Sequence, residues 1–447
     1  MSAQGRPQRE SRTLGGSAAA EPQAWEGHGG RTAAIALAAT LAIQVYTSFA
    51  ATATAVLAPE LARDFGVESR WIGVFVGIVY IGGMTASLAC GGFIERYGSI
   101  RVSQACVGLC AIGVLAMALA PASAALVLAV AAIVIGLGYG PITPASSQLL
   151  QRTAPPSRMA FTFSIKQTGV PAGAALSGAI LPIVALALDW RVAFALVALF
   201  GLAVIGAAQP LRAELDAERR GGGRASFAGV FAPLALLRRS RALRDLALVS
   251  FAYAAMQVCL TSFLVVHLTE GLHFTLVSAG LALTAATLGG VVGRIAWGYV
   301  ADRWLAPRNV LALVGVLAGL CGLATSIATV AWPMFALVAL AAVFGSTAIG
   351  WNGVQLSEVA RHAPPGSAGK VTGATGFVTF AGVVVGPPLF TLLSSATGSY
   401  RLGFAAFGAA SIVAALALLV RVRGQEPRAR GEDSGVRDRV SAPKDAR

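Results

Sequence analysis

The sequence predicts an all-α integral membrane protein in which twelve transmembrane helices form two six-helix halves. Hydrophobic residues make up 56% of the 447 residues and charged residues only 12%, whereas soluble domains average roughly 25% charged residues. Long apolar runs recur almost from end to end and leave no room for a soluble domain. In addition, one short polar loop occurs twice, about half a chain apart, so the two halves are related.

The doubled loop reads GGFIERYG at residues 91–98 and returns as GYVADR at residues 298–303, each time directly after an apolar run. The acidic residues Glu95 and Asp302 stand 207 positions apart (302 − 95 = 207). Solenoid repeats have periods of roughly 20–50 residues. A repeat of this length is therefore a bundle of several spans.

The apolar runs set the number of spans. A membrane-spanning helix needs about 20 mostly apolar residues, and twelve runs qualify. We expect them at residues 32–59, 71–93, 102–120, 125–150, 159–188, 192–210, 246–268, 276–299, 309–329, 332–358, 370–396 and 401–421. Arginines gather in the connections that contain the doubled loops, and acidic residues such as Glu60 and Glu270 occupy the opposite connections. By the positive-inside rule, we expect both termini in the cytoplasm and the protein in the cytoplasmic (inner) membrane.

Polar segments divide the chain. Residues 1–31 and 423–447 mix arginine with small or acidic residues, which is typical of disordered cytoplasmic tails. Residues 211–245 are rich in arginine and are expected to form a cytoplasmic linker that lies along the anionic membrane surface. A regulatory arm is the alternative for this segment. The linker separates an N-terminal half, 32–210, from a C-terminal half, 246–422.

Several functional classes are excluded by composition. The net charge of +14 comes from residues that flank apolar spans, so it indicates membrane orientation and not a nucleic-acid partner. The five cysteines lie inside apolar runs without metal-ligand spacing, so neither a metal site nor a disulfide framework is expected. The four histidines are scattered and no phosphate-binding Gly-Lys-Ser/Thr loop occurs. We expect a monomer that is no enzyme and has no cofactor, with H⁺ and Na⁺ both open as a coupling ion.

The doubled loop, placed between the second and third spans and again between the eighth and ninth, resembles the signature of the major facilitator superfamily of secondary transporters. The resemblance covers residues 32–421. It implies two halves related by a pseudo-two-fold axis along the membrane normal and transport by alternating access. It also implies a gating charge lock at the cytoplasmic ends, formed by Gly91, Glu95, Arg96 and Arg101 in the first copy and Gly298, Asp302, Arg303 and Arg308 in the second. Glu95 replaces the usual Asp of this pattern, and Leu305 stands where a Gly is usual.

Residues that break the repeat are better guides to a substrate than those that keep it. Lys166 corresponds to Gly373 and Asn352 to Ala145 at the 207-residue offset. A charge inside a span is costly unless it faces a cavity or a partner. Lys166 is therefore expected either to contact the substrate or gate, or to extend toward the cytoplasmic interface. Arg294 lies closer to a cytoplasmic end and favours a structural role beside the lock.

Polar side chains in the middle of spans complete the candidate site. Such residues either bind a small polar solute or hold helices together in lipid. By the resemblance, the first, fourth, seventh and tenth spans line the cavity. The expected substrate-binding residues are Lys166, Asn352, Tyr46, Gln44, Tyr253, Gln257 and Gln355.

Small residues and prolines in the fifth and eleventh spans indicate close helix packing. They are Gly169, Pro171, Gly173, Gly382, Gly386 and Pro387. We expect these two spans to form the interface between the halves. The Gly386-Pro387 pair of the eleventh span also resembles the motif of efflux antiporters in the same superfamily.

The charges inside the spans indicate the kind of substrate. No Asp or Glu lies in the middle of a predicted span, whereas Lys166 does. A cavity with cations and no carboxylates attracts anions. The sequence therefore predicts a secondary transporter, such as a symporter, for a small organic anion and in particular a carboxylate. Alternatives are an efflux antiporter for hydrophobic or drug-like compounds and a non-transporting membrane sensor.

Overall fold

The computed structural model describes residues 30–66, 72–121, 125–217 and 231–423. All regular structure in these residues is helical. Most of the two predicted tails, and residues 218–230 of the predicted linker, lie outside the described residues.

The described residues contain eleven helices, or helix series, that are long and apolar enough to cross a membrane. A twelfth span is a helix pair, α3 and α4, bent by 57° at Cys90. The prediction of an all-helical membrane protein with about twelve spans is confirmed. Several spans are interrupted, which the apolar runs alone did not reveal.

The first half contains six spans and a short helix beyond them. Its helices are α1 (Gly30–Val56), α2 (Ala58–Phe65), α3 (Ile72–Ala89), α4 (Gly91–Tyr97), α5 (Ser99–Leu119), α6 (Ala125–Tyr139), α7 (Ile142–Thr153), η2 (Pro156–Arg158), α8 (Met159–Gln167), α9 (Gly169–Ala187), α10 (Trp190–Ala208) and α11 (Arg212–Leu215). The pairs α6 with α7 and α8 with α9 are each one broken span.

The second half repeats this plan. Its helices are α12 (Ala232–Arg239), α13 (Arg241–Val266), η3 (His267–Gly271), α14 (Leu276–Arg303), α15 (Pro307–Ile327), α16 (Met334–Ala348), α17 (Asn352–His362), α18 (Ala368–Thr397) and α19 (Tyr400–Arg423). Here α16 and α17 form the broken span that corresponds to α6 and α7.

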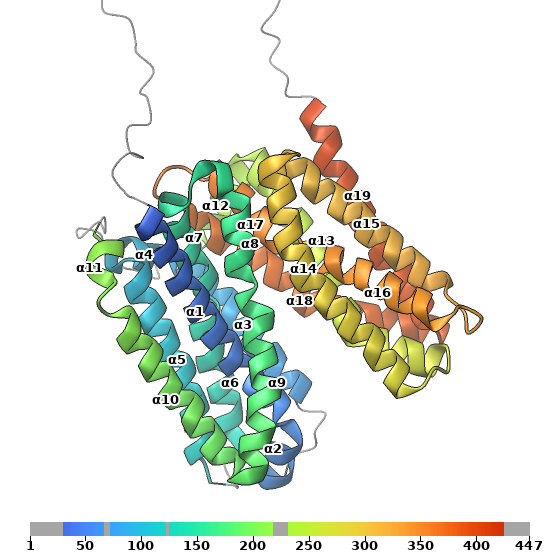
Figure 1. Cartoon of the computed structure of the whole chain (residues 1–447), viewed down its shortest axis with the longest axis horizontal. Coiled ribbons are helices and arrows are strands. Elements are labelled where there is room, and N and C mark those ends of the chain that lie inside the picture. The colour runs from blue at the N-terminus through green and yellow to red at the C-terminus, as the bar shows by residue number, and fades with distance from the viewer. Residues whose placement is uncertain (1–29, 67–71, 122–124, 218–230, 424–447) are drawn as a thin grey trace, which may run out of the picture.

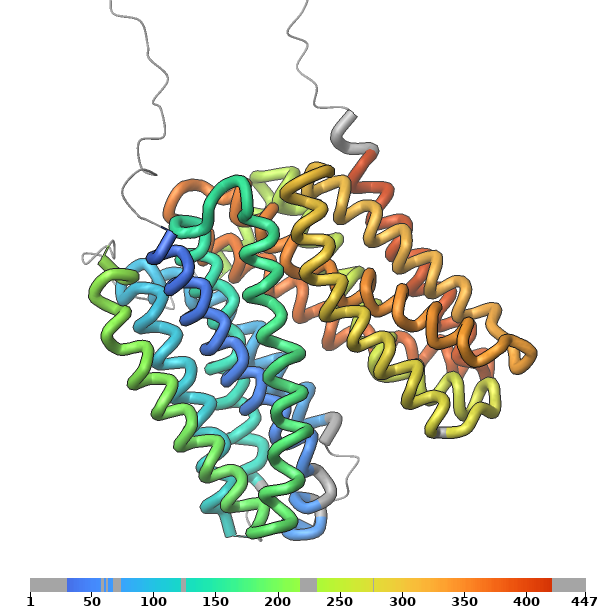
Figure 2. The backbone as a smooth tube through the Cα atoms, in the orientation of Figure 1, coloured from blue at the N-terminus to red at the C-terminus, as the bar shows by residue number. Residues whose placement is uncertain are grey.

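The two halves form two separate bundles that meet at one end only. Figure 1 shows α1 to α11 in one bundle and α13 to α19 in the other, converging where both described chain ends lie and diverging away from it. The tube view shows the same V-shaped arrangement (Figure 2). Contacts between the halves join α18 to α3 and α7, and α8 to α14 and α17. We call the converging end the terminus end.

Glycines of the doubled loops permit the close approach at the terminus end. A Cβ atom at Gly91 would overlap the side chain of Lys370, and one at Gly298 would overlap Ser164. Each glycine thus lies against a helix of the opposite half, where a side chain would hold the helices apart. The repeat in the sequence is therefore also a repeat in how the halves meet.

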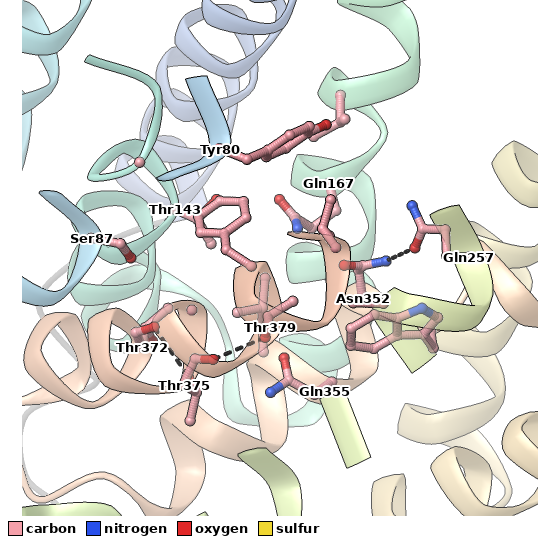
Figure 3. A pocket seen from close by; sticks show the side chains of 18 of the residues that line it. Tyr80, Ser87, Thr143, Gln167, Gln257, Asn352, Gln355, Thr372, Thr375 and Thr379 are labelled. Carbon is pink, nitrogen blue, oxygen red and sulfur yellow. Dashed lines mark hydrogen bonds between the residues drawn. The ribbon is translucent and has the colours of Figure 1, made fainter. Parts of the chain in front are cut away.

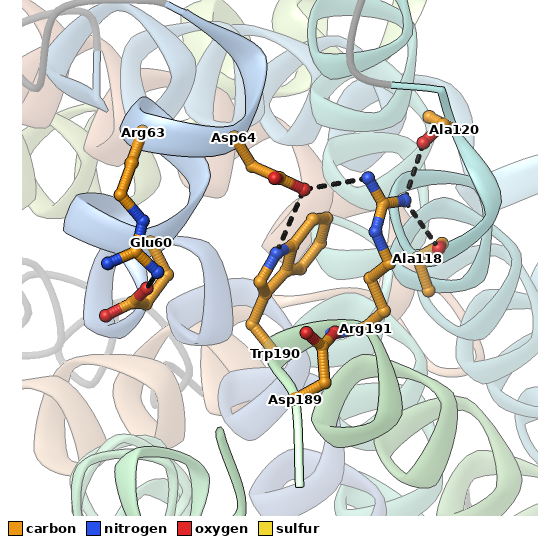
Figure 4. Close-up of polar contacts among 8 residues, drawn as sticks. All are labelled: Glu60, Arg63, Asp64, Ala118, Ala120, Asp189, Trp190 and Arg191. Carbon is orange, nitrogen blue, oxygen red and sulfur yellow. Dashed lines mark hydrogen bonds and ion pairs between the residues drawn. The ribbon is translucent and has the colours of Figure 1, made fainter. Parts of the chain in front are cut away.

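At the opposite end, polar contacts join helix ends within each half. In the first half, Arg191 donates to the Ala118 and Ala120 carbonyls and pairs with Asp64 at 2.8 Å, while the Trp190 indole donates to the same carboxylate (Figure 4). In the second half, the Arg401 guanidinium donates to the Ala328 carbonyl, and the Tyr400 hydroxyl donates to the Glu270 carboxylate. These residues connect three helix ends within one half. They stabilise each bundle as a unit.

Two helices begin earlier than their apolar runs, for identifiable reasons. The carboxylate of Asp216 accepts hydrogen bonds from the backbone N–H groups of Ile100 and Arg101, at 2.9 and 3.0 Å, so α5 begins at Ser99. The Ser240 hydroxyl accepts from the Leu243 N–H, so α13 begins at Arg241. Side-chain acceptors that satisfy free N–H groups of a first turn extend a helix beyond its apolar part.

Candidate functional site

A cavity of about 200 Å³ lies between the two halves. Residues from α3, α6, α7 and α8 of the first half and from α13, α14, α17 and α18 of the second line it. Its polar side chains are mostly amides and hydroxyls, drawn in Figure 3. Among the described lining residues, Arg294 is the only basic one, and none is Asp or Glu.

Arg294 connects the two halves at the cavity. It is 3% exposed, its Nε donates to the Ile349 carbonyl at 3.0 Å, and its Nη1 donates to the Gln167 carbonyl. Both acceptors are neutral, and within the described residues no carboxylate pairs with this guanidinium. A buried charge held only by neutral dipoles is an electrostatic site for an anion.

Breaks in two spans supply the carbonyls that Arg294 binds. The N–H of residue 171 would ordinarily bond to the carbonyl of residue 167, but Pro171 has no N–H to donate. The Gln167 carbonyl is thereby free at the junction of α8 and α9. Ile349 lies in the break between α16 and α17. Irregular backbone at membrane depth is typical where it lines a cavity.

Lys166 lies directly behind the cavity wall and is 1% exposed. Its Nζ donates to Gln44 Oε1 at 2.7 Å, to Gln167 Oε1 at 3.0 Å and more distantly to the Thr143 hydroxyl at 3.4 Å. The side chain therefore does not extend to an interface. Its acceptors are neutral, and two of them, Gln167 and Thr143, line the cavity. Lys166 adds a second buried basic group next to Arg294 without lining the cavity itself.

Three of the predicted binding residues line the cavity: Gln257, Asn352 and Gln355. Asn352 Nδ2 donates to Gln257 Oε1 at 3.1 Å (Figure 3). This bond joins α13 to the first turn of α17, so it positions both amides. Gln355 follows one helical turn later on the same face of α17.

Tyr46, Tyr253 and Gln44 are placed elsewhere. The Tyr46 ring packs edge-on against Phe200, with ring centroids 5.7 Å apart, in a space left by Gly201 of α10. Gln44 Oε1 accepts a hydrogen bond from Lys166. The Tyr253 hydroxyl donates to the Leu311 carbonyl at 2.9 Å. Both tyrosines therefore point into the core of their own half, which explains why the repeat retains them.

Sequence reasoning missed the aromatic side of the cavity. Tyr80, Tyr139 and Phe380 come from three helices, and their ring centroids lie 5.9 to 6.5 Å apart. Phe380 belongs to a row of lining residues on α18. The row comprises Thr372, Thr375, Gly376, Thr379, Phe380 and Val383, and its spacing of three and four residues is a single helix face. That spacing is visible in the sequence and could have identified this face.

The acidic residues of the doubled loops each contact the opposite half: Glu95 forms an ion pair there, whereas Asp302 accepts backbone N–H groups there and forms its ion pair within its own half. Asp302, with 7% of its side chain exposed, binds Arg361 at 3.2 Å and accepts the backbone N–H groups of Ala160 and Phe161. Glu95 binds Lys370 at 2.7 Å, and both side chains are about one-third exposed. The expected partners were the loop arginines. The carboxylates point away from the loop arginines because each one faces the first turn of a helix in the opposite half, where the helix dipole favours a negative charge.

The loop arginines have other surroundings. Arg308 lies 3.6 Å from Asp245 and donates to the Leu418 carbonyl, both in its own half. The Arg96 guanidinium lies 5.3 Å from the Tyr97 ring centroid, while Arg101 and Arg303 are exposed.

The fifth and eleventh spans both contact the opposite half, as expected, but their predicted small residues pack within the halves. A Cβ atom at Gly173 would overlap the Val45 carbonyl of α1, and one at Gly382 would overlap the Phe251 carbonyl of α13. Gly169 likewise lies against α1 and Gly386 against α13. Pro387 lies inside α18. The halves meet instead through the terminus-end parts of these spans, α8 and the first turns of α18.

Comparisons with known proteins agree on the family. The sequence model of the family described as Major Facilitator Superfamily matches residues 40–387. A hexuronate transporter of Bacillus subtilis (strain 168) is 25% identical over 399 residues, which cover 83% of this chain and 90% of that protein. A gentisate transporter of Corynebacterium glutamicum is 23% identical, with 82% of each chain covered. The crystal structure of a human organic anion transporter superposes with a TM-score of 0.70 at 18% identity, covering 86% of this chain and 99% of that one.

Proposed function

The chain belongs to the Major Facilitator Superfamily, and on that basis we propose that this secondary transporter carries a small organic anion, specifically a carboxylate, by alternating access. The observation that carries the proposal is Arg294. It lines the cavity, is buried, and has only neutral described acceptors for its charge.

Electrostatics supports an anion over a cation. Lys166 and Arg294 are both buried at the cavity, and no acidic residue among its described lining residues opposes them. A guanidinium can hold a carboxylate through two parallel N–H···O bonds. A cationic compound would find repulsion and no counter-charge in the same place.

The size of the cavity supports a small solute. Its volume of about 200 Å³ lies below the roughly 300–1,000 Å³ of pockets that enclose drug-sized ligands. The polar lining of amides and hydroxyls also suits a solute with polar groups. The alternative of an efflux antiporter for hydrophobic compounds is therefore less well supported.

The named relatives agree with this chemistry. Hexuronate and gentisate are both carboxylates, and the two relatives that carry those names each cover more than four-fifths of this chain. We also propose that the terminus end is cytoplasmic, because the arginine-rich connections lie there. In that orientation the described conformation is closed toward the cytoplasm, and Asp302 and Glu95 hold it closed.

Arg294→Gln tests the proposal. We expect carboxylate binding by the purified variant, measured by titration calorimetry, to weaken at least about tenfold, because a charge-assisted hydrogen bond contributes about 1.5–3 kcal/mol. Flux into proteoliposomes should fall with it. Thr261→Val is the matched control, since the Thr261 hydroxyl already donates to carbonyls of its own helix. Tight binding of lipophilic cations by the wild type, with none of carboxylates, would overturn the proposal.

Flux also separates the transporter from a sensor. Carboxylate binding without flux in proteoliposomes, under a proton gradient or a sodium gradient, would indicate a non-transporting membrane sensor. Comparison of the two gradients identifies the coupling ion.

A further inference from the structure

Two polar side chains of the cavity wall are buried without a hydrogen-bond partner. Among the described lining residues, the amide nitrogen of Gln355 and the hydroxyl of Thr372 have this property. Gln355 is 3% exposed and Thr372 is 1% exposed. A buried donor left unsatisfied costs free energy, so both atoms are suited to a polar group that a ligand brings.

They come from other helices than the cation of the site. Gln355 lies on α17 and Thr372 on α18, whereas Arg294 comes from α14. The neighbouring hydroxyls are already engaged, because Thr375 donates to carbonyls of α18 and Thr379 to Ser250 and to α18 (Figure 3). The cavity thus offers one site for a carboxylate and another for a hydroxyl.

A third feature is the aromatic wall formed by Tyr80, Tyr139 and Phe380. Tyr80 is 5.9 Å from Phe380 with ring planes at 45°, and Tyr139 is 6.3 Å from Phe380 at 47°. Rings at these separations attract one another through their edges and faces. A further planar ring in the cavity would extend the same arrangement. Along α18, Phe380 follows Thr372 by eight residues, about 12 Å by helical rise.

We propose that the substrate is an aromatic carboxylate that carries a ring hydroxyl, the class of the hydroxybenzoates. Arg294 binds its carboxylate, the wall of Tyr80, Tyr139 and Phe380 packs against its ring, and Gln355 with Thr372 binds its hydroxyl. The inference rests on the proposed transport of carboxylates and specifies the class within it.

A sugar acid fits the same cavity less well. A hexuronate carries hydroxyls around most of its ring, and each must keep a hydrogen-bonding partner when it leaves water. The ring faces of the aromatic wall, together with Val258, Leu356 and Val383, offer none, and this side of the cavity presents only the Tyr80 and Tyr139 hydroxyls as partners. An aromatic ring with one or two hydroxyls needs few partners and gains from the ring contacts.

Binding of four probes to the purified full-length protein tests this proposal. The probes are benzoate, 3-hydroxybenzoate, cyclohexanecarboxylate and glucuronate, each titrated calorimetrically. We expect 3-hydroxybenzoate to bind about tenfold more tightly than benzoate because it satisfies a buried donor. The affinity for benzoate should be about threefold or more higher than that for cyclohexanecarboxylate, which has the same charge and a similar size but no aromatic ring.

Variants assign each preference to its residues. Thr372→Val and Gln355→Leu should each reduce the preference for 3-hydroxybenzoate over benzoate while benzoate binding persists. Phe380→Leu should reduce the preference for benzoate over cyclohexanecarboxylate. Thr347→Val is the matched control and should keep both preferences, because Thr347 is buried outside the cavity and its hydroxyl donates to carbonyls of its own helix. Thr372→Val changes only one small group, so it keeps the test decisive if Gln355→Leu does not fold.

The outcomes separate this inference from the proposed function. If glucuronate binds more tightly than 3-hydroxybenzoate, or if Thr372→Val and Gln355→Leu leave the hydroxyl preference unchanged, the aromatic hydroxy acid is refuted and carboxylate transport stands. If none of the four carboxylates binds at all, both proposals fail.

Discussion

Removing the charge of Asp302 should open the terminus end, although the equivalent change at Glu95 should not. Asp302 accepts two backbone N–H groups at the start of α8, at 3.1 and 2.7 Å, and binds Arg361 with only 7% of its side chain exposed. Asp302→Asn keeps the shape but loses the charge. A charge-assisted hydrogen bond contributes about 1.5–3 kcal/mol and the helix dipole about 0.3–1 kcal/mol.

The expected loss for the closed state is therefore about 2–4 kcal/mol, or roughly 30- to 800-fold in its equilibrium with the open state. The pair of Glu95 with Lys370 is 28% and 36% exposed, and exposed pairs contribute about 0–1 kcal/mol. Glu95→Gln should therefore shift the same equilibrium at most about fivefold. The sequence repeat alone would assign the two residues equal effects.

The assay is maleimide labelling of a cysteine at Ser164. This side chain is fully buried and lies against Gly298 and Gly353 of the opposite half, so it becomes accessible only when the halves part. Labelling in the Ser164→Cys background should accelerate strongly with Asp302→Asn and slightly with Glu95→Gln, and transport should fall in the same order. Equal labelling rates in the two variants would refute the reasoning.

Three further predictions concern single residues. Lys166→Met should weaken carboxylate binding at least about threefold through loss of a nearby charge, and calorimetry that finds wild-type affinity would contradict the role given to Lys166. Pro171→Ala restores an N–H that competes with Arg294 for the Gln167 carbonyl, so we expect a higher melting temperature and slower flux; unchanged flux would exclude this competition. Burial raises the pKa of the Asp216 carboxyl above its ordinary value, although the N–H groups of Ile100 and Arg101 oppose the shift. The folded protein then binds more protons than the unfolded chain, so this carboxyl's contribution to stability decreases as pH rises through the interval between the two pKa values. Denaturation of Asp216→Asn across that interval should show a weaker pH dependence than that of the wild type.

The fold was predictable because its signals are local or periodic. Apolar runs of helical length, their number and the 207-residue repeat lead directly to twelve spans in two halves. The interruptions of the spans were less accessible. Pro171 is visible in the sequence, but the donor that binds the freed Gln167 carbonyl comes from a helix more than 120 residues away. Only the packing of the two halves selects Arg294 for that position.

The repeat also bears on which of the predicted site residues line the cavity. Tyr46 and Tyr253 correspond to each other at the offset, and both pack inside their own half. Asn352 breaks the repeat and lines the cavity. Gln355 corresponds to Gln148 and still lines the cavity, so the repeat separates site residues from scaffold residues only in part. Arg294 was underestimated because its distance from a helix end suggested a structural role.

In the proposed mechanism, Arg294 serves that structural role and substrate binding with the same group. Its guanidinium joins the Gln167 carbonyl of one half to the Ile349 carbonyl of the other. A substrate carboxylate is a stronger acceptor than either neutral carbonyl, so an anion bound at Arg294 competes with the contact that holds the halves together at the cavity. A ligand shifts a conformational equilibrium only through its different affinity for the two states. Competition between the substrate carboxylate and the Gln167 carbonyl for one guanidinium makes the substrate bind the two states with different affinity. The charge of the substrate thereby favours separation of the halves.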